Sequence, residues 1–276
     1  MSIKYLVTGA SGQLGAKAID ALLARVPASD IGALVRRPET AAPLEAKGVT
    51  VRIASYDDEA ALEAAFVGVE RLLLVSSSEV GKRAAQHGNV IKAAKAAGVG
   101  FVAYTSILRA DTSPLTVLPP EHKATEDALA ASGLSYAVLR NGWYTENYAM
   151  GAKGSVENGG MIGTIGEGRV SSASRDDYAE AAVIVLTGDL PASGTVYELA
   201  GDDSYTLPEF AAALTELSGK EATVTDTFTW TVTNPAPTAE DNANAVTEDS
   251  GTAATGLRSG SCRHKPGRIG HPKTAP

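Results

Sequence analysis

The chain has 276 residues, with 24 basic and 32 acidic side chains that give a formal net charge of −8, and 44% of its residues are hydrophobic. This length suffices for about two domains and a sizeable core, while the negative charge argues against nucleic-acid binding as the main function. The single cysteine, Cys262, excludes an internal disulfide framework and a cysteine-rich zinc site. With no apolar run near the roughly 20 residues that span a bilayer and no secretory signal, we expect a cytoplasmic protein that binds neither membranes nor metal.

Six short, nearly continuous apolar runs in the first half of the chain have the pattern of buried parallel strands. They occupy residues 3–8, 31–35, 49–53, 72–75, 101–105 and 136–139. Between them apolar residues recur at helical spacing, as Leu14, Ala18 and Leu22 do. Strands that alternate with helices predict a doubly wound α/β sheet with helices on both faces.

The alternation ends near residue 141, where a stretch rich in glycine and aromatic residues begins. Beyond it we expect a helix at about 176–186, a strand at 196–199, and a helix that opens on the capping-box pattern Thr206-Leu-Pro-Glu209. These elements indicate a smaller lobe that completes a cleft with the first part of the chain.

The last part of the chain differs in composition. Threonine alternates with other residues from 223 to 233, which is a strand pattern, and the chain beyond has too few large apolar side chains to form a core. We expect most of this tail to be poorly ordered. The predicted division is a first domain at 1–140, a smaller lobe at 141–225, whose helix at 176–186 returns to the first domain, and an atypical tail at 226–276.

A glycine-rich turn, Thr8-Gly-Ala-Ser-Gly-Gln-Leu-Gly15, directly follows the first strand and opens the first helix. Glycine permits both a tight turn and the close approach of a pyrophosphate to the backbone, and the helix N-terminus offers free N–H groups to negative charge. The spacing G-x-x-G-x-x-G between a strand and a helix therefore predicts a dinucleotide site. The alternative is a plain turn.

Two arginines, Arg36 and Arg37, follow the second strand, where NAD-specific folds place an acidic residue that holds the ribose 2′-hydroxyl. A carboxylate would repel a 2′-phosphate, whereas a guanidinium binds it with two hydrogen bonds. We therefore expect NADPH as the cofactor, with Arg36 as the main contact. The alternative is a solvated arginine pair on a loop.

The catalytic residues are less evident from the sequence. Many dehydrogenases use a tyrosine as the acid and a lysine four residues later that lowers the pKa of the tyrosine, but no tyrosine of this chain is followed by lysine at that spacing. Where the tyrosine-bearing helix would begin, the chain has His122 and Glu126, which share a helix face. Glu126 would orient or charge His122, which would then donate a proton to a carbonyl oxygen or polarise it. The alternative is an exposed first turn of a helix.

Hydroxyl groups gather at the ends of two further strands. Ser76, Ser77 and Ser78 follow the fourth strand, and Tyr104-Thr105-Ser106 ends the fifth, at the edge of the sheet where α/β proteins bind ligands. These hydroxyls would bind ribose, phosphate or nicotinamide, and we count Tyr104 among the catalytic candidates. The alternative is ordinary strand-end capping.

Aromatic residues follow the sixth strand in the segment Asn141-Gly-Trp143-Tyr144-x-x-Asn147-Tyr148. Their faces suit a planar acceptor, and Tyr144 is a further catalytic candidate. The alternative is that they pack the seam between the two lobes. Farther along, Arg175-Asp176-Asp177 is interpreted as a helix cap, and we expect His87 to face solvent on a helix.

With these residues identified, the chain resembles the NmrA-like family of atypical short-chain dehydrogenases, within it the bacterial NADPH-dependent quinone oxidoreductases and triphenylmethane dye reductases. The likeness rests on Val7-Thr-Gly-Ala-Ser-Gly-Gln-Leu-Gly15, on the segments at 73–80, 103–106 and 122–126, and on Leu139-Arg-Asn-Gly-Trp-Tyr144, and it extends from about residue 3 to 222.

The resemblance implies a Rossmann-type doubly wound parallel sheet with a smaller C-terminal substrate lobe. It implies hydride transfer from NADPH to a quinone, and leaves open a dye reductase, a non-catalytic NADP(H)-binding redox sensor and a homodimer. The cofactor contacts it implies are Gly9, Ala10, Ser11, Gly12, Gln13, Leu14, Arg36, Ser76, Ser77, Ser78, Leu139, Asn141, Gly142, Trp143 and Tyr144.

Overall fold

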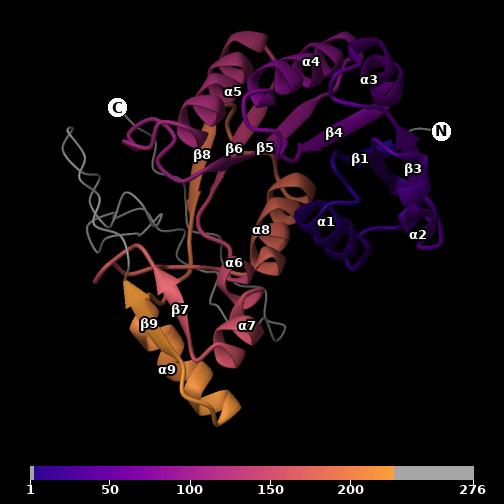
Figure 1. Ribbon diagram of the computed structural model, residues 1–276. Helices are drawn as coiled ribbons and strands as arrows, with labels where there is room; N and C mark the ends of the chain where they lie inside the picture. The colour runs from indigo at the N-terminus through magenta and orange to yellow at the C-terminus, as the bar shows by residue number, and fades with distance from the viewer. Residues whose placement is uncertain (1–2, 227–276) are drawn as a thin grey trace.

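Seven parallel strands form the central sheet of the computed structural model, which describes residues 3–226 (Figure 1). Their order across the sheet is β3-β2-β1-β4-β5-β6-β8. The bounds are β1 Ile3–Val7, β2 Ile31–Val35, β3 Thr50–Ile53, β4 Val69–Leu74, β5 Phe101–Ile107, β6 Tyr136–Asn141 and β8 Thr195–Leu199. The predicted doubly wound sheet is confirmed, although β8, which we expected in the smaller lobe, pairs with β6 in the large sheet.

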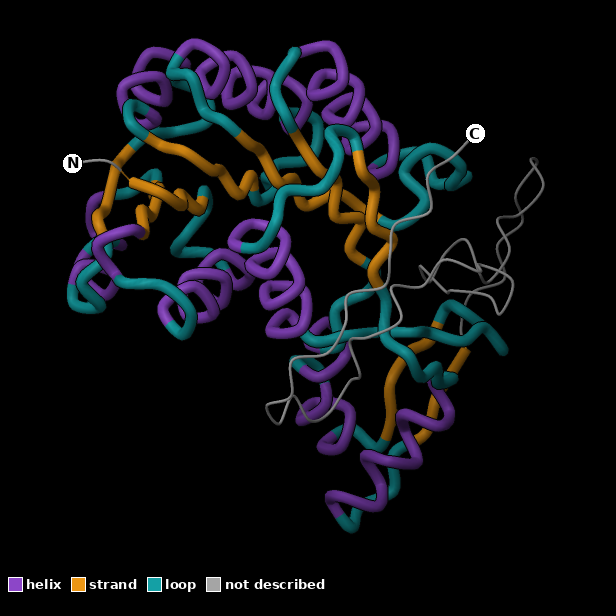
Figure 2. The backbone as a smooth tube through the Cα atoms, turned by 180° about the vertical axis from the view of Figure 1, so that it is seen from behind, coloured by secondary structure: helices purple, strands orange, loops and turns teal. Residues whose placement is uncertain are grey.

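Helices cover both faces of this sheet, as the views from front and back show (Figures 1 and 2). Leu73 of β4 packs into the core under one layer of helices, whereas its neighbours Leu72 and Leu74 point into the core under the other. This alternation explains why the strands are apolar on both faces. The first layer holds α1 Gln13–Leu23, α2 Ala42–Glu45 and α8 Arg175–Thr187, and the second holds α3 Glu59–Phe66, α4 Arg83–Ala96 and α5 Leu118–Ser132.

Helix α8 returns from the smaller part of the chain to pack beside α1. It begins with a capping box, in which Ser174 accepts a hydrogen bond from the backbone N–H of Asp177, and the Asp177 carboxylate accepts one from the backbone N–H of Ser174. The interpretation of residues 175–177 as a helix cap is thereby confirmed. Buried residues of α8 such as Val183 and Leu186 share a core with Ala18 and Leu22 of α1.

A second unit lies below the large sheet and has its own small parallel pair, β7 Gly160–Gly163 with β9 Thr223–Asp226 (Figure 1). The unit also contains α6 Glu146–Ala149, α7 Ala152–Glu157 and α9 Leu207–Ser218. Its interior is aromatic, with the rings of Tyr205 and Phe210 stacked at 5.9 Å between centroids. The capping box of Thr206 and Glu209 that opens α9 is confirmed.

Strand β9 covers the first residues of the threonine-alternating run, and the rest of that run lies outside the described residues. The tail that we expected to be poorly ordered also lies outside them, apart from its first residue, Asp226. The division of the chain at residues 140 and 225 stays a prediction. Across the described range 3–226, every helix is too short or too polar to pass through a lipid bilayer.

Candidate functional site

The glycine-rich turn joins β1 to α1 at the carboxyl edge of the sheet. Gly9 has a φ of +57°, a conformation that favours glycine. A Cβ on Gly15 would lie 2.2 Å from the carbonyl oxygen of Gly9, so only hydrogen fits there without movement of the backbone. Gly12 caps α1 without a side-chain acceptor, so within residues 3–226 no capping side chain occupies the N–H groups of the first turn. Within the turn Ser11 and Gln13 are exposed.

Arg36 follows β2, and its guanidinium Nη1 lies 2.7 Å from Oε1 of Glu79. The other carboxylate oxygen of Glu79 lies 3.3 Å from Nζ of Lys82. The neighbouring Arg37 pairs instead with Glu39, at 3.6 Å. The end of β2 is therefore cationic, but a carboxylate from the loop after β4 reaches it.

The loop after β4 contains the three predicted serines, of which Ser76 and Ser77 are half-buried and Ser78 is exposed. The backbone N–H of Ser76 donates to Oγ1 of Thr105 at 2.9 Å, and the carbonyl oxygen of Ser77 accepts from Nε of Arg83 at 2.8 Å. Thr105 thus caps the end of the neighbouring strand, which is the alternative the sequence left open. The hydroxyls of Ser76 and Ser78 have no hydrogen-bond partner within residues 3–226, so they remain available to a ligand.

His87 is fully buried, and the expectation that it faces solvent is wrong. Its Nε2 accepts a hydrogen bond from the backbone N–H of Ser77 at 2.9 Å, so the ring proton is on Nδ1, which donates to Oγ1 of Thr125. Burial, followed by the charges of His122 and Arg83, lowers the pKa of His87 to about 3. The ring is a neutral anchor for the loop.

Tyr104 and His122 form a buried dyad, with the tyrosine hydroxyl 2.7 Å from Nδ1 of the histidine. Burial raises the pKa of Tyr104, so the phenol keeps its proton and needs an acceptor. Nδ1 of His122 is that acceptor, which places the imidazole proton on Nε2. Burial and the nearby Arg83 lower the pKa of His122 to about 3, so the ring is neutral at physiological pH.

Among the described residues no hydrogen bond or ion pair joins Glu126 to His122, so the expectation that Glu126 orients His122 is wrong. Its carboxylate accepts two hydrogen bonds from the guanidinium of Arg140, at 3.0 and 2.7 Å, and a third from the hydroxyl of Ser106 at 2.6 Å. The i,i+4 spacing put both side chains on the buried face of α5, but Arg140 of β6 lies opposite Glu126 and carries the charge that it requires.

Arg140 is the centre of a buried charge cluster that the sequence did not reveal. Its Nη1 also lies 2.9 Å from Asp111 and 2.8 Å from Glu198. Burial alone would lower the pKa of Arg140, but the hydrogen bonds that its guanidinium donates to three carboxylates raise it. The bond to Asp111 lowers the pKa of that carboxyl against its own burial. The cluster joins β6, β8 and α5 at the carboxyl edge of the sheet.

The segment after β6 places polar atoms at the same edge. Asn141 donates from Nδ2 to the hydroxyl of Tyr144 at 3.3 Å, while its buried Oδ1 has no hydrogen-bond partner among the described residues. The ring of Tyr144 packs edge-on against Tyr178 at 5.2 Å. Gly142 donates its N–H to the carbonyl of Leu199. The side chain of Leu139 lies in the core, 1% exposed.

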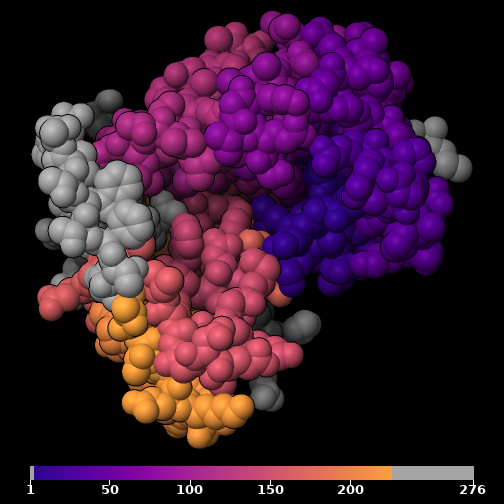
Figure 3. All heavy atoms as spheres, in the orientation of Figure 1, coloured from indigo at the N-terminus to yellow at the C-terminus, as the bar shows by residue number. Residues whose placement is uncertain are grey.

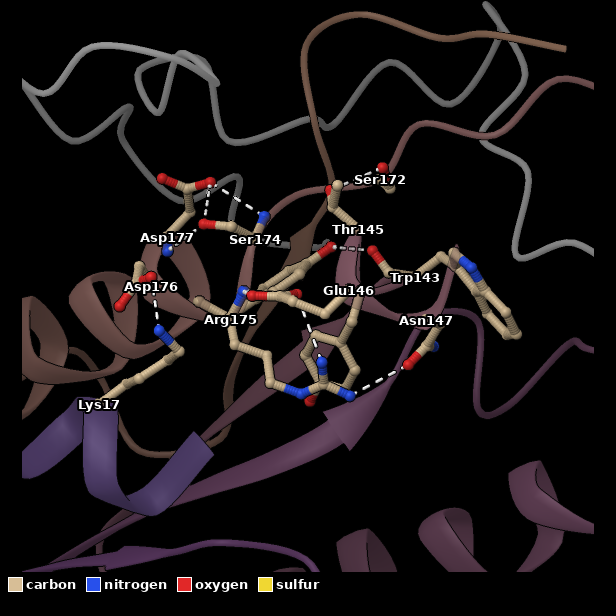
Figure 4. Close-up of polar contacts among 12 residues, drawn as sticks. Lys17, Trp143, Thr145, Glu146, Asn147, Ser172, Ser174, Arg175, Asp176 and Asp177 are labelled. Carbon is tan, nitrogen blue, oxygen red and sulfur yellow. Dashed lines mark hydrogen bonds and ion pairs between the residues drawn. The ribbon is translucent and has the colours of Figure 1, made fainter. Parts of the chain in front are cut away.

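Arg175 lies over this segment, as Figure 4 shows. Its guanidinium carbon is 4.4 Å from the centre of the Tyr144 ring, and Nη2 donates to Oδ1 of Asn147 at 3.0 Å. The carboxylate of Glu146 accepts the backbone N–H of Arg175 at 2.9 Å. These contacts tie α6 to the start of α8, and the sequence pattern, interpreted as a cap, did not indicate them.

Trp143 belongs to the aromatic interior of the smaller unit, where its ring lies 5.7 Å from that of Tyr148. Its indole points away from the guanidinium of Arg175 (Figure 4). Trp143 therefore packs into the aromatic interior of the smaller unit, and its contact with the cofactor stays a prediction. The surface is hollowed between this rose-coloured segment and the magenta upper body (Figure 3).

A doubly wound parallel sheet, a glycine-rich turn at the first βα crossover and a guanidinium at the end of β2 together define a dinucleotide-binding protein of the Rossmann type. Comparison with known proteins agrees. Residues 9–189 match the family model described as NAD(P)H-binding. The chain is 57% identical over 217 residues to quinone oxidoreductase 2 of Escherichia coli K12, which covers 79% of this chain and 75% of that protein.

Solved structures give the same result. The crystal structure of the E. coli NADPH-dependent quinone oxidoreductase complexed with NADPH superposes with a TM-score of 0.77 at 56% identity, over 81% of this chain and 78% of that one. Triphenylmethane reductase of Citrobacter sp., complexed with NADP(H), has a TM-score of 0.78 at 38% identity, over 81% and 79% of the two chains. The chain belongs to the NAD(P)H-binding family, among its NmrA-like oxidoreductases.

Proposed function

We propose that the protein is an NADPH-dependent oxidoreductase that transfers a hydride to a quinone-type acceptor. The observation that carries this proposal is the guanidinium of Arg36 at the end of β2, beside a glycine-rich turn, in a chain 57% identical to quinone oxidoreductase 2 of E. coli. A cation at this position suits a coenzyme with a 2′-phosphate.

The residues present fit a dinucleotide. The Gly15 position admits no Cβ against Gly9, and the acceptor Oδ1 of Asn141 is buried without a partner among the described residues, a state that a bound ligand would relieve. In this proposal the turn holds the pyrophosphate, and Ser76 and Ser78 offer hydroxyls. The full set proposed to contact the cofactor is Gly9, Ala10, Ser11, Gly12, Gln13, Leu14, Arg36, Ser76, Ser77, Ser78, Leu139, Asn141, Gly142, Trp143 and Tyr144.

When bound, NADPH supplies a hydride from C4 of its nicotinamide. His122 offers a neutral Nε2–H to an oxygen of the acceptor, and so stabilises the negative charge that develops there. Tyr104 is buried and does not reach the acceptor; it is a positioning residue that holds His122 in this tautomer. The ring of Tyr144 borders the acceptor. The hydride supplies one hydrogen, and the single proton that completes the quinol then comes from solvent, because His122 is not ionised at neutral pH.

Two other functions compete with this one. A triphenylmethane dye is a cation at carbon and accepts hydride without any need for a hydrogen bond to oxygen, and the 38% identity to triphenylmethane reductase favours it. A non-catalytic NADP(H) sensor would bind the coenzyme but not need the Tyr104–His122 dyad. Quinone reduction is preferred because that dyad presents a donor for which a dye has no use.

The test is the decay of NADPH absorbance with a benzoquinone, with a triphenylmethane dye, and with neither. We expect turnover of the quinone, and a loss of that turnover without a loss of dye reduction in His122→Phe. Tight NADPH binding by the wild-type protein with no turnover of either acceptor would establish the sensor. Equal loss of quinone and dye reduction in His122→Phe would contradict the proposed role of His122. That the reaction occurs in the cytoplasm, and that two copies of the chain associate, stay predictions.

A further inference from the structure

The loop after β4 places a carboxylate against the arginine that we propose selects the coenzyme. Oε1 of Glu79 lies 2.7 Å from Nη1 of Arg36, and Oε2 lies 3.3 Å from Nζ of Lys82. The carboxylate therefore bridges two cations, each through a different oxygen. About a third of the Glu79 side chain is exposed, against 63% for that of Arg36.

Hydrogen bonds within the loop after β4 hold the backbone of Glu79, and so its carboxylate, in place. The backbone N–H of Glu79 donates to Oγ of Ser77 at 3.2 Å, and its carbonyl accepts from the N–H of Lys82 at 3.1 Å. Ser77 is in turn held by Arg83 and His87, which are both buried. A turn anchored on buried side chains keeps the Glu79 carboxylate near the end of β2.

We propose that Glu79 sets the ratio of NADPH to NADH binding, a proposal that rests on the function proposed above. Folds that bind NADH hold the ribose 2′-hydroxyl with a carboxylate at the end of β2. Here β2 itself ends in a guanidinium, and the carboxylate comes to the same place from another strand. The chain thus presents an anion that accepts a hydrogen bond from the 2′-hydroxyl of NADH and a cation that pairs with the 2′-phosphate of NADPH.

The sign of the effect follows from charge. The 2′-phosphate must compete with Glu79 for Arg36 and is repelled by the carboxylate, so Glu79 lowers NADPH affinity. The 2′-hydroxyl of NADH is neutral and suffers no repulsion. Removing the charge in Glu79→Gln leaves Arg36 and Lys82 unneutralised, which favours the phosphorylated coenzyme.

The experiment is titration of the intact protein with NADPH and with NADH, followed by coenzyme fluorescence, at low and high salt. Because half-exposed charges contribute modestly, we expect Glu79→Gln to bind NADPH about fivefold more tightly and NADH about threefold more weakly. The change in NADPH affinity should shrink at high salt, where charge is screened, whereas the change in NADH affinity, which rests on a hydrogen bond to a neutral hydroxyl, should persist. Glu79→Asp, which keeps the charge, should restore most of the wild-type ratio.

Glu39→Gln is the matched control, since Glu39 pairs with the adjacent Arg37 and is exposed. It should change each affinity less than about twofold. Weaker NADPH binding in Glu79→Gln would mean that Glu79 orients Arg36 and would overturn the proposal, as would equal changes for both coenzymes. A wild-type protein that binds neither coenzyme would instead refute the proposed function itself.

Discussion

The hydroxyl of Tyr104 lies 2.7 Å from Nδ1 of His122, and both residues are buried at the carboxyl edge of the sheet. The tyrosine comes from β5 and the histidine from α5, so the dyad exists only when the helix packs on the sheet. Its consequence is a fixed tautomer, because a neutral phenol in the interior must donate its proton. The histidine then presents Nε2–H.

Removing the hydroxyl of Tyr104 should impair catalysis only because His122 loses its orientation. In Tyr104→Phe we expect kcat for a quinone to fall about tenfold, since the loss of orientation costs about 1.4 kcal/mol, while the dissociation constant of NADPH stays within about twofold. The same change in a His122→Asn background should have little further effect on kcat. Tyr197→Phe, at a partly buried tyrosine of β8, is the matched control and should leave kcat unchanged.

Stability should fall with pH below neutrality because of the two buried histidines. Each has a folded-state pKa of about 3 and an unfolded pKa of about 6.5, so the unfolded chain binds more protons between these values. The contribution of His87 and His122 is full above about pH 6.5 and is lost as pH falls toward 3, with a slope of about 1.4 kcal/mol per pH unit for each histidine.

Urea unfolding at pH 7, 6 and 5 measures this slope. The variant His122→Asn retains His87, so its free energy of unfolding should decline about half as steeply between pH 6 and 5. A free energy of unfolding that does not change from pH 7 to 5 in the wild-type protein would contradict the burial of both rings.

Replacing the buried arginine should destabilise the fold. Arg140→Met leaves Glu126 and its two acidic neighbours without a cation, which we expect to cost about 3–5 kcal/mol in the free energy of unfolding. Arg169→Met removes an exposed arginine that pairs with Glu209, and should cost no more than about 1 kcal/mol. Urea denaturation measures the free energy of unfolding of both variants. Similar losses in the two would show that burial of the arginine does not determine how much its removal costs.

Changing the cation after β2 should alter coenzyme preference. Arg36→Asp removes charge-assisted hydrogen bonds to a 2′-phosphate, so the dissociation constant of NADPH should rise about 10- to 100-fold and that of NADH much less. Calorimetric titration gives both values. Arg37→Asp serves as the control and should affect NADPH less. If Arg36→Asp weakens both coenzymes equally, the assignment to the 2′-phosphate fails.

Two glycine-to-alanine changes should have opposite outcomes. In Gly15→Ala the added methyl would lie 2.2 Å from the carbonyl oxygen of Gly9, so the turn must shift, and we expect loss of NADPH binding and lower stability. In Gly88→Ala no described atom outside the local backbone of α4 lies within 4 Å of the new methyl, and replacing a helical glycine should raise stability by about 0.5–1 kcal/mol. Thermal unfolding and NADPH titration of both variants check this.

The sequence by itself determined the features that depend on local pattern. Apolar runs located the strands, the glycine spacing located the β1–α1 turn, and the S/T-x-x-E pattern located the start of α9 at Thr206, because each rests on neighbours within about one turn of chain. The short elements α6, α7 and β7 escaped, since four to six residues hold too little periodicity to detect.

Only the tertiary structure decided which polar groups pair. Spacing placed Glu126 on the helix face of His122, but its partner Arg140 comes from another strand, and His87 is buried because a loop and a second helix close over its ring. Glu79 reaches Arg36 across 43 positions of sequence. Such contacts depend on which strands and helices lie opposite each other. Hydrophobic periodicity predicts which face of an element is buried, but it does not predict which other element packs against that face.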